Sequence, residues 1–239
     1  STTYRSSLMK LIIENFRKFL IEELSIGISQ EINDEVLDKV FEWAGVTDRS
    51  SIKHLGSASM GSAYKINSKD FGEVVLKITN DGSEAHSTAN LINSGQDHPN
   101  VYKVYKVGRL PGRGRPKYAI ITELLDQPIP EIQYAMGSLY ASVRMGEKGF
   151  HQWRGFGNDA KLDKKIDVIA NDGKTTKGLD PKQIKSYIDK IASGLTFLKN
   201  QGTDFTDLKA SNVLQRGQEP VIIDLGRVAI PKYSTIEDI

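Results

Sequence analysis

Cysteine is absent from this chain of 239 residues, and its absence excludes several kinds of site. Without thiols the protein forms no disulfides, has no thiolate nucleophile and binds no zinc through cysteine. Histidine is scarce as well, and the four histidines do not follow a metal-ligand spacing: they are His54, His86, His98 and His151. Thiol-based chemistry is therefore excluded, and a histidine metal site is not expected.

Long apolar runs are also missing. No stretch reaches the roughly 18 consecutive apolar residues of a membrane-spanning helix. Charged side chains interrupt the first apolar segment, residues 8–24, so it lacks the features of a secretory signal. The formal net charge of +2 is too small for the concentrated basic face of a nucleic-acid-binding protein. We therefore expect a cytoplasmic protein that has neither a membrane nor a nucleic acid as a partner.

Helical periodicity dominates the N-terminal part of the chain. Residues 8–24 carry apolar side chains near helical spacing, and residues 35–43 predict a second helix, capped by Asn33 and ended by Gly45. The apolar face of the second helix consists of Val36, Leu37, Val40 and Phe41. We expect both helices to pack on the rest of the chain. Partner binding or self-association through them is the alternative.

The pattern then changes to short runs of β-branched residues separated by turn residues. These runs predict a five-stranded antiparallel sheet with strands at 52–55, 62–66, 73–78, 101–107 and 118–123. The basic loop 109–117 could attract an acidic partner, although a solvated loop is the simpler interpretation. Helices are predicted again at 131–145 and 183–198. Strands followed by helices indicate an α+β fold.

A turn of small residues separates the first two predicted strands. Gly56, Ala58 and Gly61 occupy the three small positions of a G-x-G-x-x-G pattern, with alanine at the middle one. A hairpin that covers a triphosphate needs small residues where backbone amides approach the phosphate oxygens. A simple hairpin turn explains the same residues equally well.

Lys77 follows Gly61 by sixteen residues, inside an apolar run that begins at Val74. An ammonium group flanked by apolar strand residues is costly to bury without an anion. Strand alternation places Lys77 on the same face as Val75, where the α and β phosphates of a nucleotide would supply the anion. A lysine that extends to water from an edge strand is the alternative.

The most specific pattern is Asp207-Leu-Lys209-Ala-Ser-Asn212, which is followed by Asp224-Leu-Gly226. Phosphoryl transfer to a hydroxyl requires positioning and charge neutralisation more than covalent chemistry. Asp207 can orient the attacking hydroxyl and accept its proton, and Lys209 can stabilise the transferring phosphoryl group. Asn212 and Asp224 offer the oxygen ligands that Mg²⁺ prefers. A polar loop followed by a β-turn is the alternative.

These motifs resemble the catalytic loop and the metal-binding motif of eukaryotic-like protein kinases, and the resemblance covers about residues 52–230. Phe205-Thr206-Asp207 stands where that family has H-R-D, and Asp224-Leu-Gly226 stands where it has D-F-G. The resemblance implies that Asp207 is the catalytic base and that Lys77 holds the ATP phosphates. It also implies that Asn212 and Asp224 bind Mg²⁺.

The resemblance implies a nucleotide site as well. The chain after the fifth predicted strand resembles the hinge between kinase lobes, so the backbone of Glu123 and Leu125 would bind adenine and Asp126 would reach the ribose. Glu84, in a candidate helix, would pair with Lys77, although only seven residues separate the two, fewer than is usual in the family. The implied cofactors are ATP and Mg²⁺.

Thirteen residues follow Gly226, and no A-P-E motif occurs. The resemblance is therefore to a compact kinase of the kind found in bacterial effectors and bacteriophages, acting in a host-cell cytoplasm, or else the chain is a shortened one. We expect a bilobal kinase-like fold with an N-terminal helical extension (1–48), a kinase N-lobe (49–125) and a reduced C-lobe (126–239). The N-terminal helices would then replace part of the missing core.

The expected function is ATP-dependent transfer of phosphate to serine or threonine of a protein substrate. Two alternatives stay open: a small-molecule phosphotransferase similar to aminoglycoside or choline kinases, and a pseudokinase that binds nucleotide or a partner without turnover. Lys209 argues against the first alternative, because that family generally lacks a lysine there, while the absent peptide platform argues for it. Retention of Lys77, Asp207, Asn212 and Asp224 argues against the second.

Overall fold

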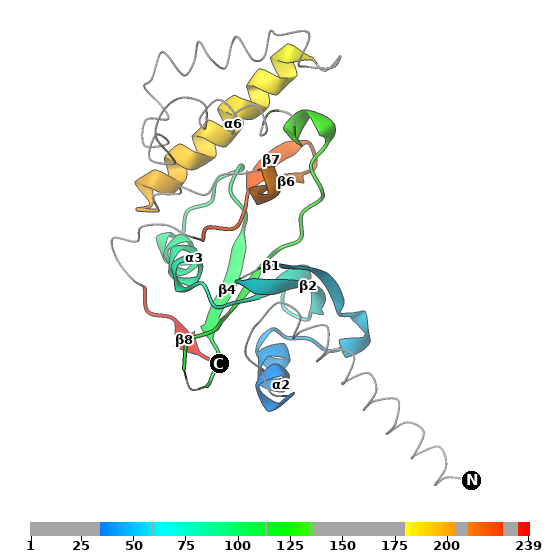
Figure 1. The fold of residues 1–239 in the computed structure, drawn as a ribbon, viewed down its shortest axis with the longest axis vertical. Coiled ribbons are helices and arrows are strands. Elements are labelled where there is room, and N and C mark those ends of the chain that lie inside the picture. Colours follow the sequence, from blue (N-terminus) through cyan, green and yellow to red (C-terminus); the bar gives the residue numbers. More distant parts are fainter. Residues whose placement is uncertain are drawn as a thin grey trace, which may run out of the picture. The chain divides into compact units, whose positions relative to one another are not determined.

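The computed structural model describes residues 34–58, 60–112, 114–133, 135, 180–203, 210–226 and 234–239. Within these residues the fold is α+β, as predicted (Figure 1). The helix predicted at 8–24 and the predicted catalytic residues Asp207 and Lys209 lie outside the described residues. No helix in the described ranges is long and apolar enough to cross a membrane.

The chain divides into two compact units, which we call unit 1 and unit 2. Unit 1 contains the described residues up to Asp81 together with Gly108–Ile121 and Glu237–Ile239. Unit 2 contains Gly82–Val107 and the described residues from Thr122 to Ile236. The units are interleaved along the chain, and the three-part organisation expected from the sequence, with boundaries at residues 48 and 125, stays a prediction.

Six strands form a mixed sheet in the order β1-β2-β3-β5-β4-β8. They are β1 (Lys53–Ala58), β2 (Gly61–Ser68), β3 (Gly72–Thr79), β4 (Val104–Arg109), β5 (Tyr118–Glu123) and β8 (Glu237–Asp238). The predicted sheet of five antiparallel strands was therefore wrong, because β8 adds a sixth strand that pairs in parallel with β4 at Gly108 and Arg109. Periodicity cannot detect β8, since its two residues are both acidic.

The core of unit 1 lies between one helix and one face of the sheet. Helix α2 (Asp34–Trp43) confirms the helix predicted at 35–43, and Gly45 follows it with a φ of +71°. The expected cap, Asn33, lies outside the described residues. The buried core side chains come from α2, β2, β3 and β5 and include Leu37, Val40, Phe41, Ala44, Tyr64, Ile66, Val74, Leu76, Ile78, Ala119 and Ile121. Burying each large apolar side chain contributes about 1.5–3 kcal/mol.

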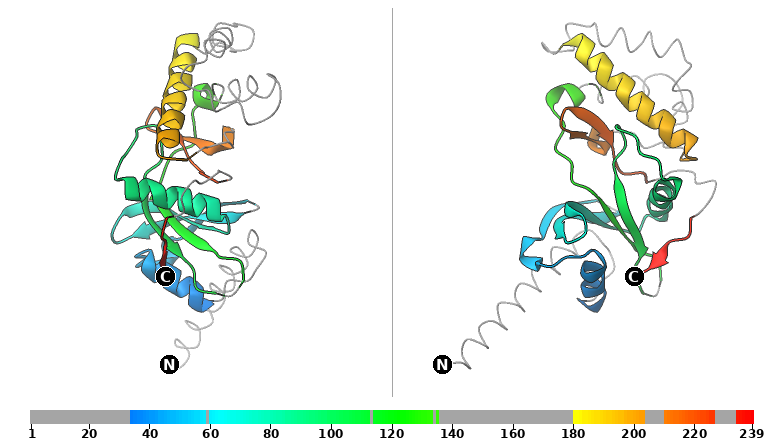
Figure 2. Two further views of the ribbon diagram at one scale, coloured as in Figure 1. Left: turned by 90° about the vertical axis from the view of Figure 1, so that its left-hand side faces the viewer. Right: turned by 180° about the vertical axis from the view of Figure 1, so that it is seen from behind.

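Unit 2 combines helices with a short hairpin (Figure 2). Its elements are α3 (Gly82–Ser94), α6 (Pro181–Asn200) and the antiparallel hairpin of β6 (Val213–Arg216) and β7 (Glu219–Ile222). The predicted apolar face of α6 is buried and consists of Ile184, Tyr187, Ile188, Ile191, Leu195 and Leu198. The helix predicted at 131–145 is helical at 130–133 and 135, and its remaining residues are not described.

Helix α6 lies close to the chain segment that leads into β4. A Cβ atom at Gly194 would lie 3.0 Å from the Asn100 carbonyl oxygen and 3.0 Å from Ile222 Cδ1, so glycine permits this approach. Asn100 Nδ2 donates to the Pro220 carbonyl at 2.8 Å, and the Asn100 carbonyl accepts from the Ile222 amide at 2.9 Å. Hydrogen bonds thus join the segment before β4 to the hairpin within unit 2.

Candidate functional site

The small residues predicted to cover phosphates lie on the hairpin β1–β2. Ala58 pairs with Gly61 next to the turn, and Gly56 pairs with Ala63 beside an irregularity in the register. A Cβ atom at Gly61 would lie 2.2 Å from the Ile78 carbonyl oxygen, so packing against β3 alone requires glycine there. Gly56 differs, because no atom lies within 4 Å of its Cβ position and its φ is +158°. The packing of neighbouring residues therefore explains glycine at position 61 and does not explain it at position 56.

Lys77 lies on β3 opposite Ala63 of β2. The side chains of β3 alternate as predicted: Val74, Leu76 and Ile78 are buried in the core, whereas Val75 and Lys77 are half-buried. Lys77 therefore projects from the face of β3 opposite the α2 core.

The hairpin β6–β7 brings the two predicted metal ligands together. The 3₁₀ helix η3 (Ala210–Asn212) ends where β6 begins, and Asp224 lies two residues after the last residue of β7, Ile222. The Ile223 amide donates to the Asn212 carbonyl at 2.9 Å, so Asn212 and Asp224 flank the open end of the hairpin. Asn212 is buried, with 2% of its surface exposed.

Asp224 has an unusual backbone conformation. Its φ of +60° is the only positive φ of a non-glycine residue in the described part of the chain. A left-handed conformation costs an L-residue about 1–2 kcal/mol, although aspartate tolerates it better than most. Strain of this kind concentrates at functional sites, which makes Asp224 a candidate for a positioned carboxylate.

Glu84 and Asp224 both act on the buried hydroxyl of Tyr102. Burial raises the pKa of Tyr102 above its ordinary value, and the negative charges of Glu84 and Asp224 raise the pKa further. The backbone of Leu225 hydrogen-bonds to the Tyr102 hydroxyl, and Thr88 Oγ1 lies 3.5 Å from the same group. Glu84 itself is 2% exposed, in the first turn of α3. Within unit 2, two carboxylates predicted at the site therefore lie near one buried hydroxyl.

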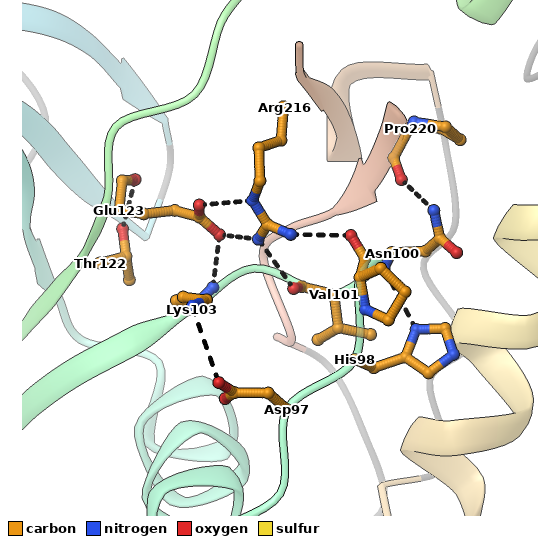
Figure 3. A network of polar contacts seen from close by, with 10 residues as sticks. Asp97, His98, Asn100, Val101, Lys103, Thr122, Glu123, Arg216 and Pro220 are labelled. Carbon is orange, nitrogen blue, oxygen red and sulfur yellow. Dashed lines mark hydrogen bonds and ion pairs between the residues drawn. The ribbon is translucent and has the colours of Figure 1, made fainter. Parts of the chain in front are cut away.

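The Glu123 side chain is occupied by an ion pair that the sequence does not suggest (Figure 3). Its Oε2 accepts from Arg216 Nε at 2.9 Å, and its Oε1 accepts from Arg216 Nη2 and, at 2.6 Å, from the Lys103 amide. The hydrogen bonds to Glu123 raise the pKa of Arg216 above its ordinary value, while partial burial lowers it. The backbone of Glu123 is also engaged, since its amide donates to the Lys103 carbonyl at 3.1 Å and its carbonyl accepts from Thr122 Oγ1 at 3.4 Å.

The chain after Glu123 is held by β6. The Asp126 amide donates to the Gln215 carbonyl at 3.0 Å, and the Gln215 amide donates to the Asp126 carbonyl at 3.0 Å. The Asp126 residue is exposed, as a ribose-binding carboxylate would need to be. Leu125 lies between the two held residues, and its side chain packs on the core of unit 2.

The predicted site residues are distributed over both units. Unit 1 contains Gly56, Ala58, Gly61 and Lys77, and unit 2 contains Glu84, Glu123, Leu125, Asp126, Asn212 and Asp224. The pairing of Lys77 with Glu84 stays a prediction. Arg216 and Tyr102 were not predicted, since neither belongs to a recognisable motif and a lone arginine or tyrosine carries no spacing signal.

The amide and carboxylate oxygens of Asn212 and Asp224 fit Mg²⁺, which takes few protein ligands and completes its shell with phosphates and water. Among the described residues no three His, Cys, Asp or Glu side chains form a group that could hold a metal on its own. No protein-family model matches the chain, and no curated protein sequence matches it significantly.

Proposed function

We propose that the protein is a Mg²⁺- and ATP-dependent protein kinase that transfers the γ-phosphate of ATP to serine or threonine hydroxyls. The observation that carries the proposal is the open end of the β6–β7 hairpin, where Asn212 and Asp224 lie on its two sides. Asp224 has a left-handed backbone there. The motif Asp207-Leu-Lys209 lies just before Asn212 in the sequence, so an acid, a cation, an amide and a second acid, which are the groups that phosphoryl transfer uses, follow one another along the chain.

Each role in the proposed reaction is assigned to a residue of this chain. Asp207 orients the attacking hydroxyl and accepts its proton, and Lys209 stabilises the charge on the transferring phosphoryl group. Lys77 neutralises the α and β phosphates. Asn212 and Asp224 hold Mg²⁺, which when bound neutralises the phosphate oxygens.

The proposal includes a bilobal kinase-like fold. In it, the sheet of unit 1 corresponds to the small lobe of a kinase, and α6 with the β6–β7 hairpin corresponds to a reduced large lobe. Two features support this: a lysine on the half-buried face of a central strand, and an Asn–Asp pair at the end of a hairpin in the helical unit. The backbone around Leu125 binds adenine, and Asp126 contacts the ribose.

Transfer of labelled γ-phosphate from ATP tests the proposal. The protein is incubated with Mg²⁺ and a generic protein substrate, and phosphosites are identified by mass spectrometry. Asp207→Ala and Lys77→Met should each reduce transfer at least about 100-fold, since each removes a group that acts in the transition state. Lys65→Met is the matched control, because Lys65 lies on the adjacent strand and pairs with Glu73 at 2.6 Å. It should transfer phosphate at the rate of the unsubstituted protein.

The outcomes separate the alternatives. Phosphate on serine or threonine that disappears in Asp207→Ala supports a protein kinase. Phosphate that appears only on an aminoglycoside or choline-like acceptor would instead identify a small-molecule phosphotransferase. Binding of ATP without transfer to either acceptor would identify a pseudokinase and contradict the proposal. Thermal unfolding of each variant shows that the comparison concerns folded protein.

A further inference from the structure

The β6–β7 hairpin has polar contacts at its turn as well as at its open end. At the turn, Arg216 and Gln215 hold the chain that follows β5. We propose that Arg216 is a positioning residue: it fixes one end of the segment 123–126 so that the backbone within this segment can bind the adenine ring of ATP. This inference rests on the proposed function and assigns to Arg216 a role that no kinase motif indicates.

The guanidinium of Arg216 makes four hydrogen bonds in a fixed geometry (Figure 3). Nε and Nη2 bind the two carboxylate oxygens of Glu123 as a fork. Nη1 donates to the Pro99 carbonyl at 2.9 Å, and Nη2 also donates to the Val101 carbonyl at 3.4 Å. Arg216 therefore ties the end of β5 to the segment before β4. A lysine would keep the charge but could not form this set of bonds.

Gln215 fixes the other end of the same segment. It exchanges two backbone hydrogen bonds with Asp126, and its Oε1 accepts from the Ile129 amide at 2.8 Å. Leu124 and Leu125 lie between the fixed ends, and within the described residues their backbone groups make none of these bonds. A purine needs a few well-placed backbone donors and acceptors beside apolar surface, and a short segment that is held at both ends offers them without a large ordering cost.

A second ion pair at the same turn provides a control for the Arg216 variants. Glu219 lies directly opposite Arg216 across the two strands and forms an ion pair with Lys190 of α6 at 2.8 Å. This second pair belongs to the same turn but does not touch the segment 123–126. Loss of the Lys190 pair should therefore disturb the hairpin without disturbing adenine binding.

The experiment compares Arg216→Met, Arg216→Lys and the control Lys190→Met in the full chain. Steady-state phosphotransfer gives kcat and the KM for ATP, and calorimetry gives the affinities for adenosine and for Mg²⁺–tripolyphosphate. Arg216→Met should raise the KM and weaken adenosine binding about tenfold while kcat stays within about twofold, because uniform binding is lost and not transition-state binding. The KM for ATP and the adenosine affinity of Arg216→Lys should lie between those of Arg216→Met and those of the unsubstituted protein. The affinity for tripolyphosphate should not change in any variant.

Unchanged adenosine affinity in both Arg216 variants would overturn the inference, as would a fall in kcat at constant KM, which indicates a merely structural role. If Arg216→Met does not fold, Arg216→Lys and Glu123→Gln apply the same test with smaller perturbations. The charge-exchanged double variant Arg216→Glu with Glu123→Arg should recover part of the adenosine affinity. An unsubstituted protein that neither binds adenosine nor transfers phosphate would instead refute the proposed function, so the two failures are distinguishable.

Discussion

The hairpins β1–β2 and β6–β7 both carry predicted site residues, but they hold these residues in different ways. In β1–β2 the glycine at position 61 is explained by the β3 backbone, which fills the space where a Cβ atom would be. In β6–β7 packing gives no such explanation for Asp224, which keeps a strained φ of +60°. Asn212, across from it, is buried and bonded to Ile223 through its carbonyl.

The difference gives a criterion for separating structural from functional residues. A motif residue whose identity follows from a neighbouring backbone atom needs no ligand to explain it. A motif residue that keeps a backbone conformation of higher energy for an L-amino acid is a candidate for a functional role, because strain of this kind concentrates at functional sites. By this criterion Gly61 is weak support for phosphate binding, and Asp224 is strong support for a positioned carboxylate.

The largest effect on stability should come from the core beneath the first hairpin. Phe41→Ala removes a buried aromatic ring of α2 that is 3% exposed, and it should lower the free energy of unfolding by about 3–4 kcal/mol. Urea denaturation measures this change. Glu42→Ala, at the exposed neighbouring position, should change the free energy by less than about 0.5 kcal/mol. Equal stability of the two variants would show that α2 does not contribute to the core.

Gly61→Ala should be the next most destabilising change. The added Cβ would lie 2.2 Å from the Ile78 carbonyl oxygen and 2.9 Å from Thr79 Cα, so strands must separate, at a cost of about 2–3 kcal/mol. Gly56→Ala meets no atom within 4 Å and should cost about 1 kcal/mol through its backbone conformation alone. Thermal unfolding compares the two variants. A larger loss of stability in Gly56→Ala than in Gly61→Ala would contradict the structural explanation of Gly61.

Asp224→Gly should separate stability from activity in the second hairpin. Glycine adopts a positive φ without strain, so the free energy of unfolding should stay constant or rise by about 1 kcal/mol. Phosphotransfer should nevertheless disappear with the metal ligand. Asp224→Asn, which tolerates the same backbone conformation, should lose activity at unchanged stability. Retained activity in both variants would exclude Asp224 as a ligand.

The smallest effect concerns pH and His98, whose ring contacts Ser193 and Phe197 of α6. Burial lowers the pKa of His98 below its ordinary value, and its Nδ1 accepts from the Asn100 amide at 3.1 Å. The unfolded chain therefore binds more protons, so the contribution of neutral His98 is complete above about pH 6.5 and is lost as the pH falls below that value. Urea denaturation at about pH 7.5 and at about pH 5.5 measures this change. Between these pH values His98→Gln should lose slightly less free energy of unfolding than the unsubstituted protein. An identical pH profile would contradict this assignment.

Local periodicity was sufficient to predict α2 and α6, because each helix buries one apolar face and its residues recur at helical spacing. The same reasoning missed β8, whose pairing uses only backbone groups and leaves no trace in its side chains. It also placed the fourth strand too early: the prediction was 101–107, and β4 is Val104–Arg109. Val101 and Tyr102 instead pair with Ile222 of β7, a contact that depends on the tertiary fold.

The proximity of predicted site residues could be inferred from the sequence only where the residues are close along the chain. The motif that ends in Asn212 and the motif that begins with Asp224 are joined by a hairpin, so their proximity follows from the turn between them. Arg216 and Glu123 are 93 residues apart, and no local pattern relates them. The roles of all the predicted site residues, Asn212 and Asp224 included, stay predictions.

The pairing of β8 with β4 bears on how the protein behaves at high concentration. An open sheet edge can add a strand from another chain and start aggregation. Glu237 and Asp238 cover part of this edge with exposed acidic residues, and Ile239 fills the space beside Gly108, where a Cβ atom would lie 2.7 Å from Ile239 Cγ1. A strand so short and so negatively charged repels further strands, so residues 237–239 should protect the sheet from forming intermolecular fibres.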